Sequence, residues 1–302
     1  MWISSVYAVV LNWNLAPDTA ACIKSLEDAG LPLTQLILVD NGSTDDSLDE
    51  LVRTFGGRIK YAPSAENLGF AGGTNLGIRY ALQAGADWVL LINNDTFVSP
   101  TFLEELAAAV QARPGWRILS PMILYAGEPD VIWSLGDRRI GPTLLTHGLL
   151  RNRCAPDDLP AYLDADSVNA CAMLVHRDVF ARIGGFDEAY FMYAEDADFC
   201  WRAQQAGIQM GAATRARMWH KVSRSTGVYH PQSRYWRIRN QIRFYRSQGT
   251  TRHIWYLLGF TALRTLFLTM KDACAGRFAL IRTSWRAWRD GWCDHLQASA
   301  RS

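Results

Sequence analysis

The chain has 302 residues, 49% of them hydrophobic, so it is long enough to bury a substantial core. Its 31 Lys and Arg residues nearly balance 29 Asp and Glu residues, and the net charge of +2 argues against a general nucleic-acid-binding protein. Six cysteines occur without a C-x-x-C pair, which indicates neither a zinc site nor a disulfide framework.

The first 120 residues alternate between strand-like and helix-like patterns. Continuous apolar runs predict buried strands at 6–11, 36–39 and 88–92, with 58–61 as a further candidate. Helices are predicted from Pro17 to Gly30, over 48–55, from a glycine-rich turn at 67–73 to about Gly85, and after Ser99. This alternation predicts an α/β fold: a mainly parallel sheet with helices on both faces and a ligand at the carboxyl ends of its strands.

Beyond this region the pattern becomes irregular, with short strands and turns between residues 116 and 168. Val168–Val175 predicts a further strand. The acid-rich segment 195–198 then predicts the start of a helix that runs to about Gly207.

Acidic side chains are concentrated in two places. Three of the four residues in 195–198 are acids, in a segment rich in aromatic and apolar side chains where uncompensated charge is costly to bury. Asp95 follows the predicted strand 88–92, and Asp40 and Asn67 also follow strand-like segments, so these three side chains should meet at one edge of the sheet. An acid after a buried strand and an acid cluster that begins a helix are the groups needed for metal-assisted group transfer.

Two of these segments also have simpler interpretations. Asp40 and the following 41–46 are equally typical of a turn and a helix cap. The segment 67–75 lacks the Gly-Lys-Ser/Thr ending of a P-loop and does not fit G-x-G-x-x-G. Its glycines either allow close approach of a ligand to the backbone or form a tight turn.

Taken together, the motifs resemble those of the family 2 glycosyltransferases of the GT-A type, especially the branch that contains bacterial rhamnosyltransferases. The resemblance covers about residues 5–245, and we take residues 1–245 as one glycosyltransferase domain. It rests on five motifs in the order of the family: Val9–Asn14, Val39–Asp45, Asn67–Asn75, Leu91–Thr96 and Gly185–Asp198. It implies a GT-A (Rossmann-like) fold, with a mainly parallel mixed sheet flanked by helices. We interpret the irregular segment 116–168 as an insertion that shapes an acceptor pocket.

The resemblance implies a nucleotide-sugar donor, as a dTDP-, UDP- or GDP-sugar. Asp40 matches the acid that binds the donor nucleoside. Asn14, Asn67 and Gly69 match further donor-site positions, and Asn93 stands at the first position of the metal motif, where it would also contact the donor.

The same resemblance implies a divalent metal. Asn93-Asn94-Asp95 occupies the position of the D-x-D motif, and because Asn93 is a neutral ligand, Asp95 would provide most of the binding of Mg²⁺ or Mn²⁺. His220 matches a histidine that completes the metal site in this family, although a lone histidine is more often structural. Lys221 and Arg224 are either diphosphate contacts or a solvated basic loop.

Asp196 matches the catalytic base of the family. An acceptor hydroxyl has a pKa far above 7, so a carboxylate must take its proton as the new bond forms, and a single base without a covalent nucleophile implies inversion. Glu195, Asp198 and Arg202 are assigned supporting roles: orienting Asp196, capping the helix or forming an ion pair. The implied reaction is transfer of a sugar, such as L-rhamnose from dTDP-L-rhamnose, to a glycan or lipid-linked glycan in cell-surface polysaccharide synthesis.

The composition changes after about residue 245, which makes 246–302 a second, helical region. The run 254–270 is apolar except for Arg264 and a few threonines, and its 17 residues are short for a membrane span. At 100° per residue, one stripe of the next helix collects Phe278, Ile281, Trp285, Trp288 and Trp292.

Two interpretations of that stripe stay open. It belongs either to an interfacial helix with a cationic flank of Arg282, Arg286 and Arg289, or to a terminal helix docked on the body. We expect the former: a C-terminal extension that associates with the membrane surface, and a protein at the cytoplasmic face of the inner membrane, peripheral or shallowly inserted.

Two other classes of function share features with this sequence. A sugar-nucleotide pyrophosphorylase shares the broad fold, but its N-terminal glycine-rich signature with a basic residue is replaced here by Leu11–Ala16. A non-catalytic nucleotide-sugar-binding module of a membrane assembly complex would bind donor without turnover. The presence of Asp196 beside Glu195 argues against that alternative.

Overall fold

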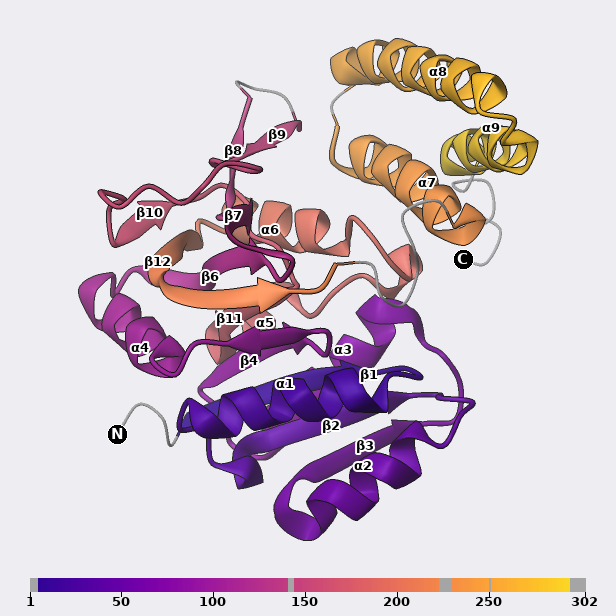
Figure 1. The fold of residues 1–302 in the computed structure, drawn as a ribbon. Helices are drawn as coiled ribbons and strands as arrows, with labels where there is room; N and C mark the ends of the chain where they lie inside the picture. Colours follow the sequence, from indigo (N-terminus) through magenta and orange to yellow (C-terminus); the bar gives the residue numbers. More distant parts are fainter. Residues whose placement is uncertain (1–4, 141–143, 223–229, 250, 294–302) are drawn as a thin grey trace.

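The structure is a computed structural model that describes residues 5–140, 144–222, 230–249 and 251–293. Within these ranges, ten strands form one mixed sheet with helices on both faces, and three C-terminal helices lie beside it (Figure 1). The predicted α/β class, with a mixed sheet flanked by helices and a helical C-terminal region, is confirmed.

The first half of the sheet is parallel. Its strand order is β3 (Lys60–Ser64), β2 (Leu36–Asn41), β1 (Val6–Asn12) and β4 (Trp88–Asn93). Every residue of β2 is buried, as expected for a strand covered on both faces. The four predicted strands are therefore present: β1, β2 and β4 begin at the predicted residue and end one or two residues later, while β3 begins two residues later and ends three residues later than predicted.

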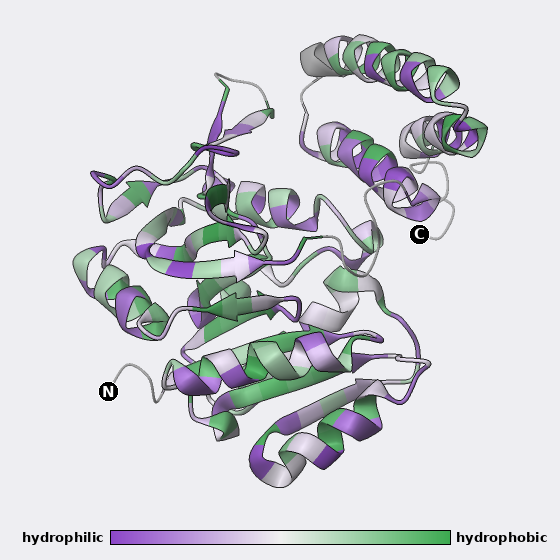
Figure 2. Ribbon diagram, in the orientation of Figure 1, coloured by the Kyte–Doolittle hydropathy of each residue, from purple (hydrophilic) through white to green (hydrophobic). Residues whose placement is uncertain are grey.

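Helices divide the core into two apolar layers, one on each face of the sheet. One layer receives side chains from α1 (Ala16–Asp28), α2 (Ser47–Phe55) and α4 (Phe102–Ala112). The other receives side chains from α3 (Gly69–Gln83), α5 (Arg177–Ile183) and α6 (Glu195–Gln205). Colouring by hydropathy shows the apolar strands between these layers (Figure 2).

The second half of the sheet mixes strand directions. β11 (Ala172–His176) is antiparallel to β4 and to β6 (Trp116–Tyr125), while β12 (Gln209–His220) is parallel to β6. The short strand β5 (Thr96–Val98) pairs with the end of β12, and Thr96 lies opposite His220. This pairing brings the residues that follow β4 next to the end of β12.

Shorter strands extend the outer side of the sheet. β7 (Glu128–Ser134) pairs with β6, and β10 (Tyr162–Asp164) pairs with β12. A separate hairpin is formed by β8 (Asp137–Arg139) and β9 (Thr146–Gly148).

Three sequence-based predictions need correction. The glycine-rich segment 67–73 is not mainly a turn, because α3 already begins at Gly69. The first part of the supposed insertion, 116–125, is the sheet strand β6 between β11 and β12. The strand predicted from Val168 begins only at Ala172.

The C-terminal region consists of α7 (Pro231–Gln248), α8 (Thr251–Cys274) and α9 (Phe278–Cys293). These helices pack on one another, and α7 also bonds to the loop before α6. The predicted domain boundary at 245/246 stays a prediction, and it falls within α7. Across the described part of the chain, every helix is too short or too polar to span a membrane.

The predicted stripe on α9 does not form one outward face. Trp288 and Trp292 pack against Ile238 and Ile242 of α7, and the Trp288 indole nitrogen lies 3.3 Å from the Thr261 hydroxyl of α8. Phe278 alone of the five is as much as 67% exposed. For these two tryptophans, the interpretation as a docked terminal helix is therefore the correct one.

Candidate active site

A cleft of about 670 Å³ opens at the carboxyl ends of the central strands and is lined by both predicted acids, Asp95 and Asp196. Asp95 follows β4, and Asp196 lies in the first turn of α6. The antiparallel pairing of β11 with β4 brings residues 169–171, which precede β11, to the same end of the sheet as Asp95. Two acids 101 positions apart in sequence thus face one cavity.

Asp95 and His220 form a buried pair in this cleft. The His220 Nε2 atom lies 3.1 Å from the Asp95 carboxylate, and the two residues are 6% and 7% exposed. The pairing of β5 with β12 brings them together, and the Lys221 backbone N–H donates to the Asp95 carbonyl. The imidazole lies edge-on to Trp133, and its buried Nδ1 has no hydrogen-bond partner within the described ranges.

This pair offers only part of a metal coordination shell. Within the described ranges, no group of three or more His, Cys, Asp and Glu residues could hold a metal ion. One carboxylate and one imidazole nevertheless fit a site that takes its remaining ligands from substrate phosphates and water, as Mg²⁺ sites commonly do. The His220 Nε2 atom and the Asp95 carboxylate, 3.1 Å apart, are compatible donors for such a site.

Asp196 is half-buried and is held by backbone donors. The Ala197 N–H lies 2.8 Å from one carboxylate oxygen, and the Ala170 N–H lies 3.5 Å from the other. Burial is the main effect on its acidity and raises the pKa of Asp196, while these two N–H groups oppose that rise. A carboxylate with a raised pKa and an open side is suited to accept a proton.

Glu195 lines the same cleft but is more deeply buried. It is 6% exposed, and its Oε2 atom has no hydrogen-bond partner in the described structure. Burial, followed by the negative charge of Asp196, raises the pKa of Glu195 well above its ordinary value. The two adjacent carboxyl groups therefore share a site that disfavours double ionisation.

The loop before these acids has an unusual backbone. Phe191, Tyr193 and Ala194 all have positive φ, at +60°, +67° and +71°. Such conformations cost a non-glycine residue about 1–3 kcal/mol each and persist only where the surroundings impose them. Ala194 is also the N-cap of α6, so the loop sets how the first turn of that helix meets the cleft.

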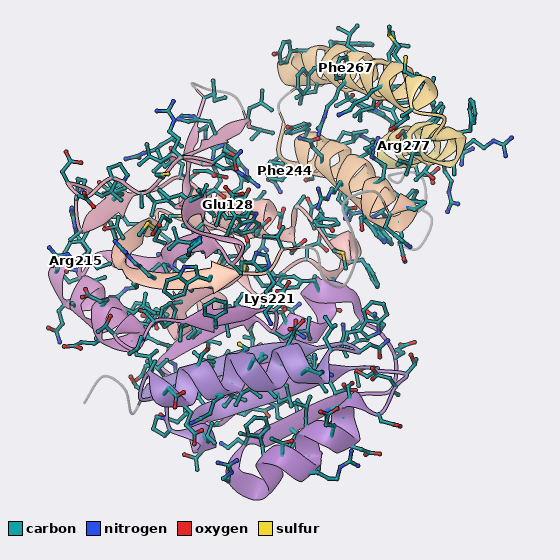
Figure 3. The ribbon with its side chains drawn as sticks, viewed as in Figure 1. Glu128, Arg215, Lys221, Phe244, Phe267 and Arg277 are labelled. Atoms are coloured by element: carbon teal, nitrogen blue, oxygen red, sulfur yellow. The ribbon has the colours of Figure 1, made fainter. Side chains whose placement is uncertain are left out.

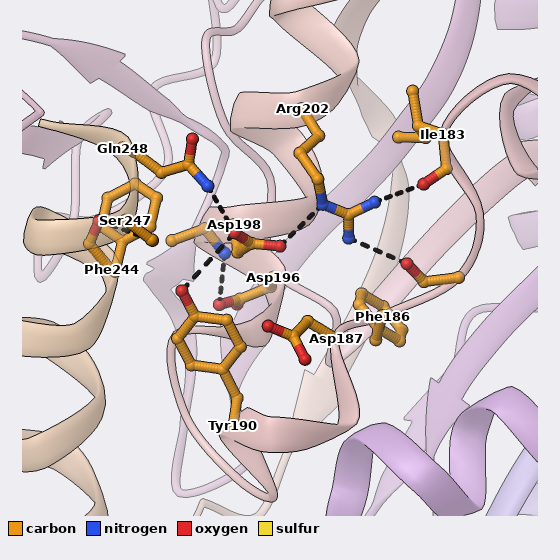
Figure 4. A network of polar contacts seen from close by, with 12 residues as sticks. Ile183, Phe186, Asp187, Tyr190, Asp196, Asp198, Arg202, Phe244, Ser247 and Gln248 are labelled. Atoms are coloured by element: carbon orange, nitrogen blue, oxygen red, sulfur yellow. Dashed lines mark hydrogen bonds and ion pairs between the residues drawn. The ribbon is translucent and has the colours of Figure 1, made fainter. Parts of the chain in front are cut away.

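Asp198 and Arg202 stand behind the cleft and do not line it. Their ion pair is 2.7 Å long, and the Arg202 guanidinium also donates to the carbonyl oxygens of Ile183 and Gly185 (Figure 4). Asp198 further accepts from Gln248 of α7 at 3.0 Å. This network ties α6 to the loop after α5 and to α7, which is one of the supporting arrangements that the sequence left open.

Some of the predicted donor-site residues line the cleft and others do not. Asn67, Gly69 and Asn93 line the cleft. Asn14 and Asp40 are not among its lining residues. Asp40 accepts hydrogen bonds from Asn12 at 2.9 Å and from the Ser43 hydroxyl at 2.6 Å, and Asn14 is bound to Thr44. Direct contact of Asp40 and Asn14 with a donor stays a prediction.

Several cleft residues were not singled out from the sequence, namely Tyr125, Trp133, Arg151, Asn169, Tyr193 and Arg237. Arg237 lies over the Tyr193 ring, with 4.6 Å between guanidinium carbon and ring centroid. The first three come from 116–168, so this segment does contribute to the cleft. Lys221, in contrast, forms an ion pair with Asp18, and Arg224 lies outside the described residues. No sequence signal marks an isolated Tyr or Arg as a cleft residue.

Comparisons with known proteins identify the family of this chain. The family model described as glycosyl transferase family 2 matches residues 7–141, and the model of glycosyl transferase family group 2 matches residues 88–288. The chain belongs to glycosyltransferase family 2. The motifs on which the resemblance rested lie within these two matches.

Curated relatives of this family 2 glycosyltransferase include a hexosyltransferase and an L-rhamnosyltransferase. It is 29% identical to a low-salt glycan biosynthesis hexosyltransferase of Haloferax volcanii over 67% of this chain and 62% of the relative. It is 28% identical to the N-acetylglucosaminyl-diphospho-decaprenol L-rhamnosyltransferase of Mycobacterium tuberculosis over 72% of this chain and 76% of the relative. The chain thus spans less than two thirds of the Haloferax protein.

Solved structures confirm the fold. GalNAc-T7, crystallised with UDP, GalNAc and Mn²⁺, gives a TM-score of 0.60 at 14% identity over 80% of this chain and 47% of that one. TarS of S. aureus gives a TM-score of 0.55 at 18% identity, over 79% and 39% of the two chains. At these identities the likeness establishes the GT-A-like architecture and nothing finer.

Proposed function

We propose that this family 2 member is an inverting, metal-dependent glycosyltransferase that uses a nucleotide-sugar donor, dTDP-L-rhamnose, and a glycan or lipid-linked glycan acceptor in cell-surface polysaccharide synthesis. The observation that carries the proposal is the placement of Asp95 and Asp196 in one cleft. The rhamnosyltransferase relatives of Mycobacterium tuberculosis and Shigella flexneri support the choice of donor, and the lipid-linked acceptor in the name of the former supports the choice of acceptor.

The proposed chemistry is a single displacement at the anomeric carbon. The acceptor hydroxyl oxygen forms the new bond, its proton passes to the Asp196 carboxylate, and the bond to the nucleoside diphosphate breaks on the opposite side. Asp196 is suited to this role because burial raises its pKa and its carboxylate borders the cleft. Attack from the side opposite the leaving group inverts the configuration.

Asp95 and His220 would hold the metal, Mg²⁺ or Mn²⁺. When bound, the ion would stabilise the negative charge that develops on the departing diphosphate. Asn67, Gly69 and Asn93 line the part of the cleft assigned to the donor. Asp40, near the end of β2, and Asn14, after β1, both bond to the loop that follows β2. Glu195, whose Oε2 atom has no hydrogen-bond partner among the described residues, would be a second proton-binding group beside the base.

We further propose that residues 1–245 form the glycosyltransferase domain and that 246–302 contact a membrane surface at the cytoplasmic face. Support comes from the outer side of α8, where large apolar side chains are exposed, including Phe267 (Figure 3). A lipid-linked acceptor would be reached from such a surface.

The test is an Asp196→Asn variant assayed with a panel of nucleotide sugars and Mn²⁺. We expect donor binding, measured by thermal shift, to persist while the transfer rate falls by about 10²–10⁴-fold, the usual contribution of a general base. The control variant is Asp178→Asn, which removes one charge from an exposed acid on α5. This variant should transfer sugar at the wild-type rate.

Retention of more than about a tenth of the transfer rate in Asp196→Asn would rule out this base. A wild-type protein that binds donor without any turnover would instead identify a non-catalytic binding module. Release of pyrophosphate would indicate a sugar-nucleotide pyrophosphorylase.

A further inference from the structure

Helix α7 holds the loop that precedes the proposed base, and the contact centres on one buried amide. Asn240 is fully buried, and its Nδ2 atom donates to the carbonyl oxygens of Tyr190, Met192 and Tyr193. The distances are 2.7 Å to Met192 and 3.2 Å to Tyr193. One side chain of the C-terminal helices thus binds three backbone groups within four residues.

The three carbonyl oxygens converge because of the local backbone. Positive φ at Phe191 and Tyr193 turns successive peptide groups away from the course of an ordinary strand or helix. Buried carbonyl oxygens need donors, and an amide nitrogen supplies two hydrogens at one point. The Asn240 Oδ1 atom accepts from Arg239, at 2.8 Å, which favours the orientation of the amide that directs its nitrogen to the loop.

Further contacts hold the loop from both sides. From α7, the Trp236 ring stacks on Phe191 with 5.0 Å between centroids, and Arg237 lies over the Tyr193 ring. From α3, the Ala71 N–H donates to the Phe191 carbonyl at 3.2 Å. The loop therefore lies between the helix next to the donor positions and the first helix of the C-terminal region.

We propose that Asn240 is a positioning residue for glycosyl transfer, which fixes the loop 190–194 in the conformation that directs Asp196 into the cleft. This inference rests on the proposed function, in which Asp196 is the base. Because Ala194 caps α6, any relaxation of the loop moves the first turn of that helix and its carboxylate. A displacement of about 1 Å in a reacting group is sufficient to slow catalysis by about 10²-fold.

The first test compares Asn240→Ala and Asn240→Asp with Tyr235→Phe. The aspartate keeps the shape of the side chain but removes its donors. Tyr235 lies on the same helix, and its phenylalanine variant removes a single hydrogen bond, 3.0 Å long, to Asp290 of α9. We expect both Asn240 variants to lose at least about tenfold in kcat with donor affinity within about twofold, and Tyr235→Phe to keep the wild-type kcat.

The second test needs no activity. In donor-free Asn240→Ala, hydrogen exchange should accelerate in the amides of 189–197 but not in the strands of the central sheet. In Tyr235→Phe, it should not accelerate in either region. If wild-type protein transfers no sugar, the proposed function fails, and this exchange pattern still decides whether Asn240 orders the loop.

Three results would overturn the inference. The first is an unchanged hydrogen-exchange pattern in Asn240→Ala together with a kcat within twofold of wild type. The second is hydrogen exchange in Asn240→Ala that accelerates equally throughout the molecule, and the third is a wild-type kcat in Asn240→Asp. The second would show a role in stability alone, and the third would show that the donors of the amide are not needed.

Discussion

At the scale of single residues, the pKa of Glu195 is unusual and affects the stability of the fold. Its carboxyl group is buried, has an oxygen without a partner in the described structure, and lies next to Asp196. Burial raises its pKa well above the ordinary Glu value of about 4.3. The folded chain then binds this proton more tightly than the unfolded chain, so the free energy of unfolding falls as the pH rises from about 4.3 through the folded-state pKa.

Glu195→Gln should remove this pH dependence, because glutamine keeps the shape of the side chain and has no charge to desolvate. We expect the variant to exceed wild type in free energy of unfolding at pH 8, with a smaller difference at pH 5. Urea unfolding of both proteins at the two pH values checks this, with Glu104→Gln on the surface helix α4 as the control. A difference that is equal at both pH values would contradict the raised pKa.

Gly69 provides a second residue-scale prediction. Its φ is +74°, and a Cβ atom there would lie 2.5 Å from the ring and the carbonyl oxygen of Phe191. Gly69→Ala should therefore displace the loop before the base as well as strain its own backbone. Gly85, at φ +90°, has no atom of the described residues within 4 Å of such a Cβ and is the matched control.

We expect Gly85→Ala to cost about 1–2 kcal/mol of stability, the usual penalty of a left-handed conformation, without a change in transfer rate. Gly69→Ala should cost more and should also lower kcat. Thermal unfolding and kinetics of both variants measure the two effects. Equal losses of stability with equal rates would show that the contact with Phe191 has no consequence.

At the scale of secondary-structure elements, the glycines of α3 explain why one sequence-based prediction was wrong. Glycine clusters usually mark turns, but a Cβ at Gly77 would lie 2.2 Å from Val9 of β1, and one at Gly73 would lie 2.6 Å from Leu11. These glycines serve close packing of a helix on the sheet. Local propensity depends only on residues close in sequence and takes no account of Val9 or Leu11. The sequence alone therefore could not distinguish a glycine-rich turn from a helix that packs closely on the sheet.

The other elements also show that local sequence patterns could be interpreted correctly, whereas contacts between distant residues could not. Continuous apolar runs located β1, β2 and β4 because strands covered on both faces need no polar alternation. The strand β6, in contrast, was taken for part of an insertion, because its pairing with β11 and β12 joins residues far apart in sequence. Likewise, Asp95 and Asp196 could be assigned from motifs, whereas Arg151 and Arg237 enter the cleft only through the tertiary fold.

At the scale of the whole molecule, α8 presents an apolar surface that the described residues leave uncovered. Six exposed residues define it, and we call them the α8 face: Trp255, Tyr256, Leu263, Leu266, Phe267 and Met270. At 100° per residue they fall within about 120° of the helix circumference. The opposite side of α8, including Leu257 and Thr265, is buried.

The α8 face, and not the predicted tryptophan stripe of α9, is therefore the surface that we expect to enter a lipid headgroup layer. Leu263 and Phe267 are 69% and 66% exposed, and burial of each such side chain is worth about 1.5–3 kcal/mol. The double variant Leu263→Glu with Phe267→Glu should lower the fraction bound to anionic vesicles at least about tenfold.

Flotation with vesicles at low salt measures this binding. The matched control is the double variant Val52→Glu with Tyr80→Glu, which introduces two acids at exposed apolar positions of α2 and α3. Wild-type protein that remains wholly in the soluble fraction, or equal binding by both double variants, would contradict a membrane role for α8. These substitutions are preferable to truncation after about residue 250. Truncation would also remove the partners of α7, and Asn240 of that helix orders the loop before Asp196.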